Sequence, residues 1–276
     1  MMKRIIPMAL VGLSIVGLAW TLAPNKALTD LEVYTEKGKT YFRGVWTKGT
    51  NAQSLKAYDS PEDFENAWEE MGKTGFSLRD IAIDEKEDAV KVYAVYEKLA
   101  DKTTPVKFNT WAEFETDWKA KEKAGQELVD FDYYYLYGEE VFYGVYGGSG
   151  KKIHLFKTKT WGDMENTIKE YGTKKRELKD LDRAKIDGDW NYIGFFTEGD
   201  KALTYKAFKV SSNEAVERQA GANAKKGEIL IEADGFEQGN AITHITVYVK
   251  QPQPNALFSS TSWTDFEAKF KELSPQ

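Results

Sequence analysis

The sequence predicts an α+β protein built from five tandem repeats of about 50 residues, each with three strands followed by one helix. Three signals support this organisation, because each recurs five times with that spacing: a capped helix start, a Leu-x-Asp or Leu-x-Glu strand start, and a run of aromatic and β-branched residues. Strands joined by such short connections pair antiparallel. We therefore expect a large, curved, half-barrel-like antiparallel sheet with the helices packed on one of its faces.

Each expected helix begins with a serine or threonine, and four of the five have Asp or Glu three residues later. In such a capping box the hydroxyl accepts a bond from a free backbone N–H, and the acid lies at the positive end of the helix. Apolar residues then follow at helical spacing, as in Phe64, Trp68 and Met71, so each helix should turn one apolar stripe to a core. The five expected cap residues are Ser60, Thr110, Thr160, Ser212 and Ser262.

The first strand of each repeat begins at a Leu-x-Asp or Leu-x-Glu motif, and the second is an aromatic run such as YFRGVW or FYGVY. Turn-rich pieces separate it from a short third strand, such as SLKAY or IHLF. The repeats span about 28–73, 78–123, 128–173, 178–226 and 230–274, within a single repeat domain of residues 28–276. The last helix either ends an open array or docks on the first strand triplet. We expect the open array, because nothing in the sequence demands closure.

One acid recurs at the third position of every strand-start motif. These residues are Asp30, Asp80, Asp130, Asp180 and Glu232. One acid per repeat could form a ring of metal ligands, but side chains alternate along a strand, and we expect these acids to face outward between apolar neighbours. A hard cation needs converging oxygen ligands, and the sequence does not show such convergence. We therefore expect no metal site and no cofactor.

The second strands carry an aromatic residue at one shared position. These candidate ligand-binding residues are Trp46, Tyr96, Tyr146, Phe196 and Tyr248. Such a row forms either a core layer, which is the commoner case, or a ladder of platforms for an extended ligand. The residue two positions earlier is always small (Gly44 in the first repeat), which leaves room for a close approach. Both faces of these strands are largely apolar, so both need cover.

Composition and the N-terminus indicate an exported globular protein. The chain has 276 residues, of which 41% are apolar and 30% charged, with a formal charge of −6 that argues against a nucleic-acid partner. The lack of cysteine excludes disulfides and thiol catalysis. Residues 1–27 combine a basic start with an apolar stretch, and predict a signal peptide cleaved near Ala27 or, alternatively, a signal anchor. We expect a periplasmic or secreted protein that touches the membrane only if residues 1–27 are retained.

The combination of an aromatic-anchored helix, G-x-x-L-x-D and Y-x-[GA]-V-[WY] resembles the bacterial tandem repeat domain. That family lies beside β-lactamase-related serine hydrolase domains, as in polyglycine hydrolases. The best matches are Gly75, Leu78 and Asp80 with Tyr93–Tyr96, and the same motif 50 residues later. The resemblance implies a broad, curved antiparallel sheet with packed helices. It transfers no catalytic residue, because family members carry their chemistry in the hydrolase domain, which is missing here.

No nucleophile motif stands in a suitable context. There is no G-x-S-x-G and no phosphate-binding loop, and we expect the two histidines, His154 and His244, to be structural. The favoured hypothesis is an exported, non-catalytic binding protein that recognises an extended ligand or a protein or polymer of the cell envelope or exterior. The alternatives are a hydrolase with a carboxylate pair in the concave sheet and a self-assembling structural protein of the envelope.

Overall fold

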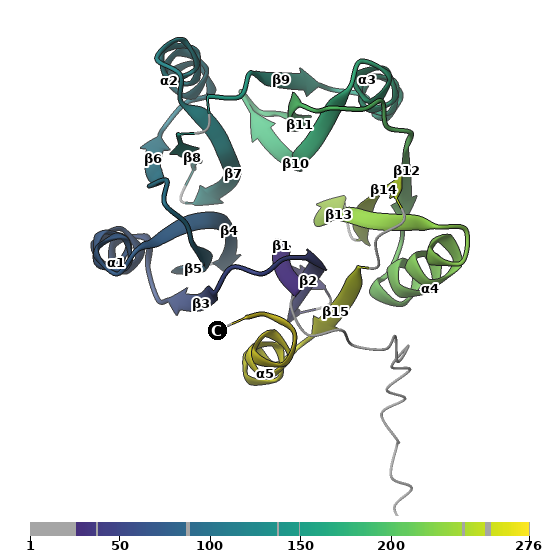
Figure 1. Cartoon of the computed structure of the whole chain (residues 1–276), viewed down its shortest axis with the longest axis horizontal. Helices are drawn as coiled ribbons and strands as arrows, with labels where there is room; N and C mark the ends of the chain where they lie inside the picture. The colour runs from purple at the N-terminus through teal and green to yellow at the C-terminus, as the bar shows by residue number, and fades with distance from the viewer. Residues whose placement is uncertain are drawn as a thin grey trace, which may run out of the picture.

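The computed structural model describes residues 26–36, 38–86, 89–136, 138–148, 150–238, 241–251 and 255–275. Its strands form five three-stranded antiparallel sheets, and each strand triplet of the sequence is followed by a helix. The prediction of five βββα repeats is thus confirmed. In place of the expected single curved sheet, the five separate sheets stand as blades around a common axis, with the helices on the outside (Figure 1).

Each blade has an inner, a middle and an outer strand. The inner strands, which line the axis, are β1 (Lys26–Glu36), β4 (Phe76–Lys86), β7 (Glu127–Leu136), β10 (Arg176–Ile186) and β13 (Glu228–Gln238). The middle strands are β2 (Lys39–Lys48), β5 (Ala89–Lys98), β8 (Glu139–Gly147), β11 (Asp189–Glu198) and β14 (Ala241–Lys250). The outer strands are β15 (Ala256–Ser260), β3 (Gln53–Tyr58), β6 (Thr104–Phe108), β9 (Ile153–Thr158) and β12 (Tyr205–Val210). In this order the strands make up blades 1 to 5.

The helices start where the sequence predicts. They are α1 (Pro61–Lys73), α2 (Trp111–Lys123), α3 (Trp161–Thr173), α4 (Asn213–Ala224) and α5 (Trp263–Leu273). Every predicted cap hydroxyl accepts a bond from the backbone N–H three residues on, at 3.0 to 3.2 Å. None of the helices in the described part of the chain combines the length and hydropathy needed to cross a membrane.

The ring is closed, and the expected open array is wrong. Each blade joins the outer strand of one repeat to the inner and middle strands of the next. Blade 1 takes its outer strand from the C-terminus, because β15 pairs antiparallel with β2 and places Ala256 opposite Trp46. Helix α5 seals this blade through Phe266, which packs on Trp46 with ring centroids 5.6 Å apart. The first and last strands of the ring therefore belong to one sheet (Figure 1).

Closure gives both faces of every sheet a cover. The faces of neighbouring blades meet directly, as where Phe42 of blade 1 contacts Tyr93 of blade 2 with ring centroids 5.1 Å apart. Toward the outside, helices fill the wedges between blades, and Phe64 of α1 is fully buried against Tyr143 of blade 3. The two apolar faces read from the sequence are thus both used in packing.

The aromatic row forms part of the core. Its members, Trp46, Tyr96, Tyr146, Phe196 and Tyr248, are each at most 1% exposed. Two members of the row have a polar partner inside the protein: Trp46 Nε1 donates to Ser274 Oγ at 3.0 Å, and the Tyr96 and Tyr58 hydroxyls lie 3.0 Å apart. A Cβ on Gly44 would lie 2.5 Å from the Trp46 ring, so the small neighbour makes room for the ring itself. The row offers no open platform to an extended ligand.

The predicted signal segment falls almost wholly outside the described residues and stays a prediction. Its last two residues, Lys26 and Ala27, are described and belong to β1, where both are buried. Intact-mass measurement of protein recovered from the exported fraction would test it. We expect a mature chain that begins near Leu28, whereas a chain that keeps residues 1–27 and resists carbonate extraction would show an anchor.

The core role of the aromatic row is testable with Tyr96. Tyr96→Ala should destabilise the fold by about 3–5 kcal/mol, because it leaves a cavity where a buried ring was, and should lower the Tm by about 10 °C. Tyr96→Phe keeps the ring and loses only the hydroxyl contact with Tyr58, so its cost should be about 1 kcal/mol. Thermal and urea unfolding measure both. Trp190→Ala, at a site that is 43% exposed, is the control. A Tyr96→Ala protein that melts like the parent would contradict the core assignment.

Candidate metal centre

A repeated β-bulge turns the motif acids toward the axis. In every inner strand the pairing with the middle strand slips by one residue just before the acid, as between Leu28 and Asp30 in β1. A bulge of this kind re-aims the side chain that follows it. The prediction that these acids face outward is therefore wrong, because simple alternation does not survive the extra residue.

A second set of acids lies two residues further along the inner strands. Together with the five motif acids they give nine carboxyl groups around the axis, the second set being Glu32, Asp132, Asp182 and Asp234. Blade 2 has Ala82 at this position. A cavity of about 30 Å³ lies among the carboxylates of blades 1 to 4. One water needs about 10–15 Å³, so this space has room for about two waters, and Glu232 is not among the residues that line it.

Burial raises the pKa of all nine carboxyl groups above their ordinary values. It raises the pKa of Asp30 to about 7 and that of Asp182 to about 6. Repulsion adds to burial at Glu232, where neighbouring carboxylates such as Asp30 raise the pKa further. The ring therefore holds an excess of negative charge that protons or cations must offset.

All seven aspartates in the cluster are tied to a backbone N–H. Four of these bonds cross from one blade to the next. The Leu31 N–H donates to Asp80 at 2.8 Å, and the Ile81 N–H donates to Asp130 at 2.8 Å. The Phe131 N–H donates to Asp180 at 3.2 Å, and the Ala233 N–H donates to Asp30. The other three are local, since Asp132, Asp182 and Asp234 each accept from the residue that follows. The cross-blade bonds explain why the repeat carries an acid, because they join adjacent blades at the axis.

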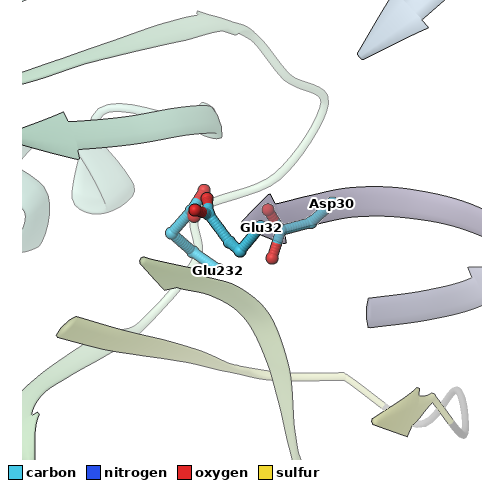
Figure 2. Close-up of side chains that lie close together, drawn as sticks. All are labelled: Asp30, Glu32 and Glu232. Carbon is cyan, nitrogen blue, oxygen red and sulfur yellow. The ribbon is translucent and has the colours of Figure 1, made fainter. Parts of the chain in front are cut away.

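The two glutamates have no such bond. Glu232 is 2% exposed, and its Oε1 has no hydrogen-bond partner. Neither Glu32 nor Glu232 accepts a backbone N–H among the described residues. Instead they point toward each other from β1 and β13, with Asp30 beside them (Figure 2). Ligand oxygens of these three residues all lie within 4.8 Å of one another. The group spans the junction between blades 1 and 5.

Arg43 supplies a positive charge at the same junction. It is fully buried on β2, and it donates to Ala233 O at 3.1 Å and to Asn213 Oδ1 at 2.8 Å. Its charge lowers the pKa of Asp30 and of Asp234. His244 lies beside it, and burial together with the Arg43 charge lowers the pKa of His244 to about 3, so the imidazole is neutral. Lys179 also lines the cavity and Arg183 interacts with Asp234, so three positive groups stand against nine carboxyl groups.

This arrangement suits a hard divalent cation. Carboxylate oxygens are the ligands that Ca²⁺ and Mg²⁺ prefer, and the three converging carboxylates would supply part of such a coordination shell. The convergence that the sequence did not show is thus present. By contrast, the carboxylate-pair hydrolase needs a substrate between its acids, and a substrate pocket has about 300–1,000 Å³. The cavity of about 30 Å³ among the acids of blades 1 to 4 is far smaller than that.

Sequence reasoning identified Asp30 and Glu232 as possible ligands and missed Glu32. A signal was available, because four of the five repeats have a second acid two residues after the first. Residues at i and i+2 share a strand face, so both acids of each pair follow the bulge to the axis. His244 is fully buried beside Arg43, while His154 lies apart on the outer strand of blade 4.

The buried aspartates predict a pH effect on the metal-free protein. Asp182 has a pKa of about 6 in the folded state against 3.8 when exposed, so the folded state binds more protons over that interval. The stability that Asp182 contributes should be complete below about pH 4 and should be lost as the pH rises through about 6. His244 acts in the opposite direction, because its pKa is lowered, but it is a single group.

Urea unfolding in EDTA at pH 4.5 and pH 7.5 measures this effect. We expect the lower midpoint at pH 7.5, and a smaller difference in Asp182→Asn, which cannot ionise. A midpoint that climbs steadily from pH 4.5 to 7.5 would contradict the assignment of buried, protonated acids.

Comparisons with known proteins do not assign the chain to a family. No protein-family model matches it, and no curated protein matches it either. The resemblance to the bacterial tandem repeat domain therefore stays a prediction. The function has to be inferred from the geometry of the ring and its axis.

Proposed function

We propose that this is an exported, non-catalytic binding protein whose ring holds a hard divalent cation, foremost Ca²⁺, at the junction of blades 1 and 5. One observation carries the proposal: Glu232 is a buried carboxylate with an unpartnered oxygen, and it converges with Asp30 and Glu32 within 4.8 Å. A buried charge without a partner is costly, and a cation removes that cost.

The donor set favours Ca²⁺ over other metals. Three carboxylates and no sulfur or imidazole point to a hard cation, since zinc and copper sites use nitrogen or sulfur ligands. His244 is the nearest imidazole of this junction, but it faces Arg43, whose charge would repel a cation on that side. Ca²⁺ accepts irregular coordination, whereas Mg²⁺ demands near-ideal octahedral geometry, so carboxylates of unequal reach suit Ca²⁺ better.

The cation would clamp the ring where the chain ends meet. Glu32 and Asp30 belong to the first strand, and Glu232 belongs to blade 5, so a shared ion joins two blades. Blade 1 is also the blade that β15 completes by pairing with β2. Calcium sites of extracellular modules bind at about 10⁻⁴–10⁻³ M, which fits a protein whose N-terminus predicts export. A rigid ring of this kind can present its rim to a partner in the envelope.

Calorimetric titration of chelator-treated protein with CaCl₂ tests the proposal. We expect one site per chain and a rise in melting temperature with Ca²⁺. At a Ca²⁺ concentration of 100 Kd the added stability should be about 2.7 kcal/mol, or a shift of about 5–10 °C. Glu32→Gln should weaken binding, because it replaces a charged ligand by a neutral one.

Glu69→Gln is the matched control, since Glu69 is an exposed helix residue that should leave binding unchanged. The proposal fails if Ca²⁺, Mg²⁺ and Mn²⁺ all give neither heat nor a melting shift with the parent protein. It also fails if Glu32→Gln and Glu69→Gln bind alike.

A further inference from the structure

We infer that Glu232 determines whether this ring binds a cation: its one additional methylene group turns a structural position into a ligand, and aspartate there would tie blade 5 to blade 4 instead. The inference rests on the proposed cation site. It starts from the repeat itself, where the first axial acid is aspartate in four units and glutamate in the fifth.

The four aspartates define what the position does by default. Each reaches the preceding blade and accepts the N–H of the residue after that blade's own acid, as Asp180 accepts from Phe131. By the same rule, the donor for blade 5 would be Leu181. No bond from Leu181 to Glu232 exists in the structure, and both residues are described. The longer side chain turns toward blade 1, where it meets Glu32 (Figure 2).

The second axial position, two residues after the first acid of an inner strand, shows the same replacement of aspartate by glutamate. Asp132, Asp182 and Asp234 occupy it in three blades, and each is held by the N–H of the next residue. Glu32 occupies it in blade 1 and has no such bond. The two positions at which glutamate replaces aspartate are thus the two whose carboxylates accept no backbone N–H, although the Glu232 side chain shares a hydrogen bond with Asp30. They lie on different blades, 200 residues apart in the chain, and they face each other.

Two effects follow from this pairing. A carboxylate that already accepts a backbone N–H is a weaker and less mobile ligand. A carboxylate without such a bond is freer to turn its oxygens to an ion. Because Glu232 does not accept the Leu181 N–H, the junction of blades 4 and 5 also lacks the backbone-to-acid bond that the other junctions have. Glu232 therefore gives up one structural contact and supplies one ligand, and a single substitution should reverse both.

The test is Glu232→Asp, which installs the residue of the other four repeats. We expect Ca²⁺ affinity to fall at least 100-fold by calorimetry. We also expect the metal-free melting temperature to be unchanged or raised, because the shorter carboxylate can accept from the Leu181 N–H. Hydrogen exchange of metal-free protein should show slower exchange at the Leu181 amide than in the parent. Glu232→Gln, which keeps the length and removes the charge, should lose affinity without slowing that exchange.

Asp180→Glu is the matched reverse exchange in blade 4. It should lower the metal-free melting temperature, because it disturbs the bond from Phe131, and should change Ca²⁺ affinity less than threefold. If the parent binds Ca²⁺ and Glu232→Asp binds within threefold of it, the inference is overturned while the cation site stands. If Glu232→Asp loses stability and the Leu181 amide gains no protection, the default role assigned to aspartate is wrong. If the parent itself binds no cation, the proposed function falls.

Discussion

Hydrogen bonds from backbone N–H groups to aspartates join adjacent blades at four of the five junctions around the axis, and the other features of the ring depend on them. Each carboxylate has to lie beside the neighbouring blade, which requires the bulge before it to turn the acid inward. Each N–H has to be free to donate outside its own sheet, which the displaced register at the bulge permits. Once the inner strands are fixed in this way, the wedges between blades widen outward and need large apolar side chains. The aromatic row and the helix stripes fill them.

The same bonds create the main electrostatic problem of the fold. A carboxylate is a better acceptor than an amide or hydroxyl, but burying several of them close together raises their pKa and favours their neutral forms. Aspartates that accept an N–H recover part of that cost, as the lowering of the Asp80 pKa by Leu31 N–H indicates. Glu32 and Glu232 recover none in this way. A cation at their junction would neutralise the most costly pair and would do so where the ring depends on noncovalent closure.

Closure itself uses several independent contacts. The pairing of β15 with β2 acts on the outside, and Trp46 bonds to Ser274 beneath α5. On the inside, Arg43 of blade 1 reaches Ala233 of the last repeat and Asn213 at the start of α4. The two Arg43 contacts hold a buried charge close to the axial acids, so they are sensitive to charge at the axis. Ion binding and ring closure are therefore expected to stabilise each other.

The local structure of this protein could be predicted from sequence, while its assembly could not. Cap residues such as Thr110 and periodic apolar positions such as Phe64 depend only on near neighbours, and the helices and strands follow from them. The direction of Asp30 depends on a bulge, and a bulge is a property of two paired strands rather than of one. The partner of β15 could not be read either, because an outer strand can pair with any free middle strand. The metal hypothesis was rejected for the same reason: five acids spaced along a chain converge only if the chain closes.

Anomalous diffraction from crystals grown with Mn²⁺ or Tb³⁺ in place of Ca²⁺ would test the central claim most directly. The account predicts one strong peak on the axial side of the junction between blades 1 and 5, about 2.2–2.6 Å from carboxylate oxygens of Glu32 and Glu232. The absence of any peak at the axis would contradict the account. So would an ion bound elsewhere while Glu32 and Glu232 are hydrogen-bonded to each other.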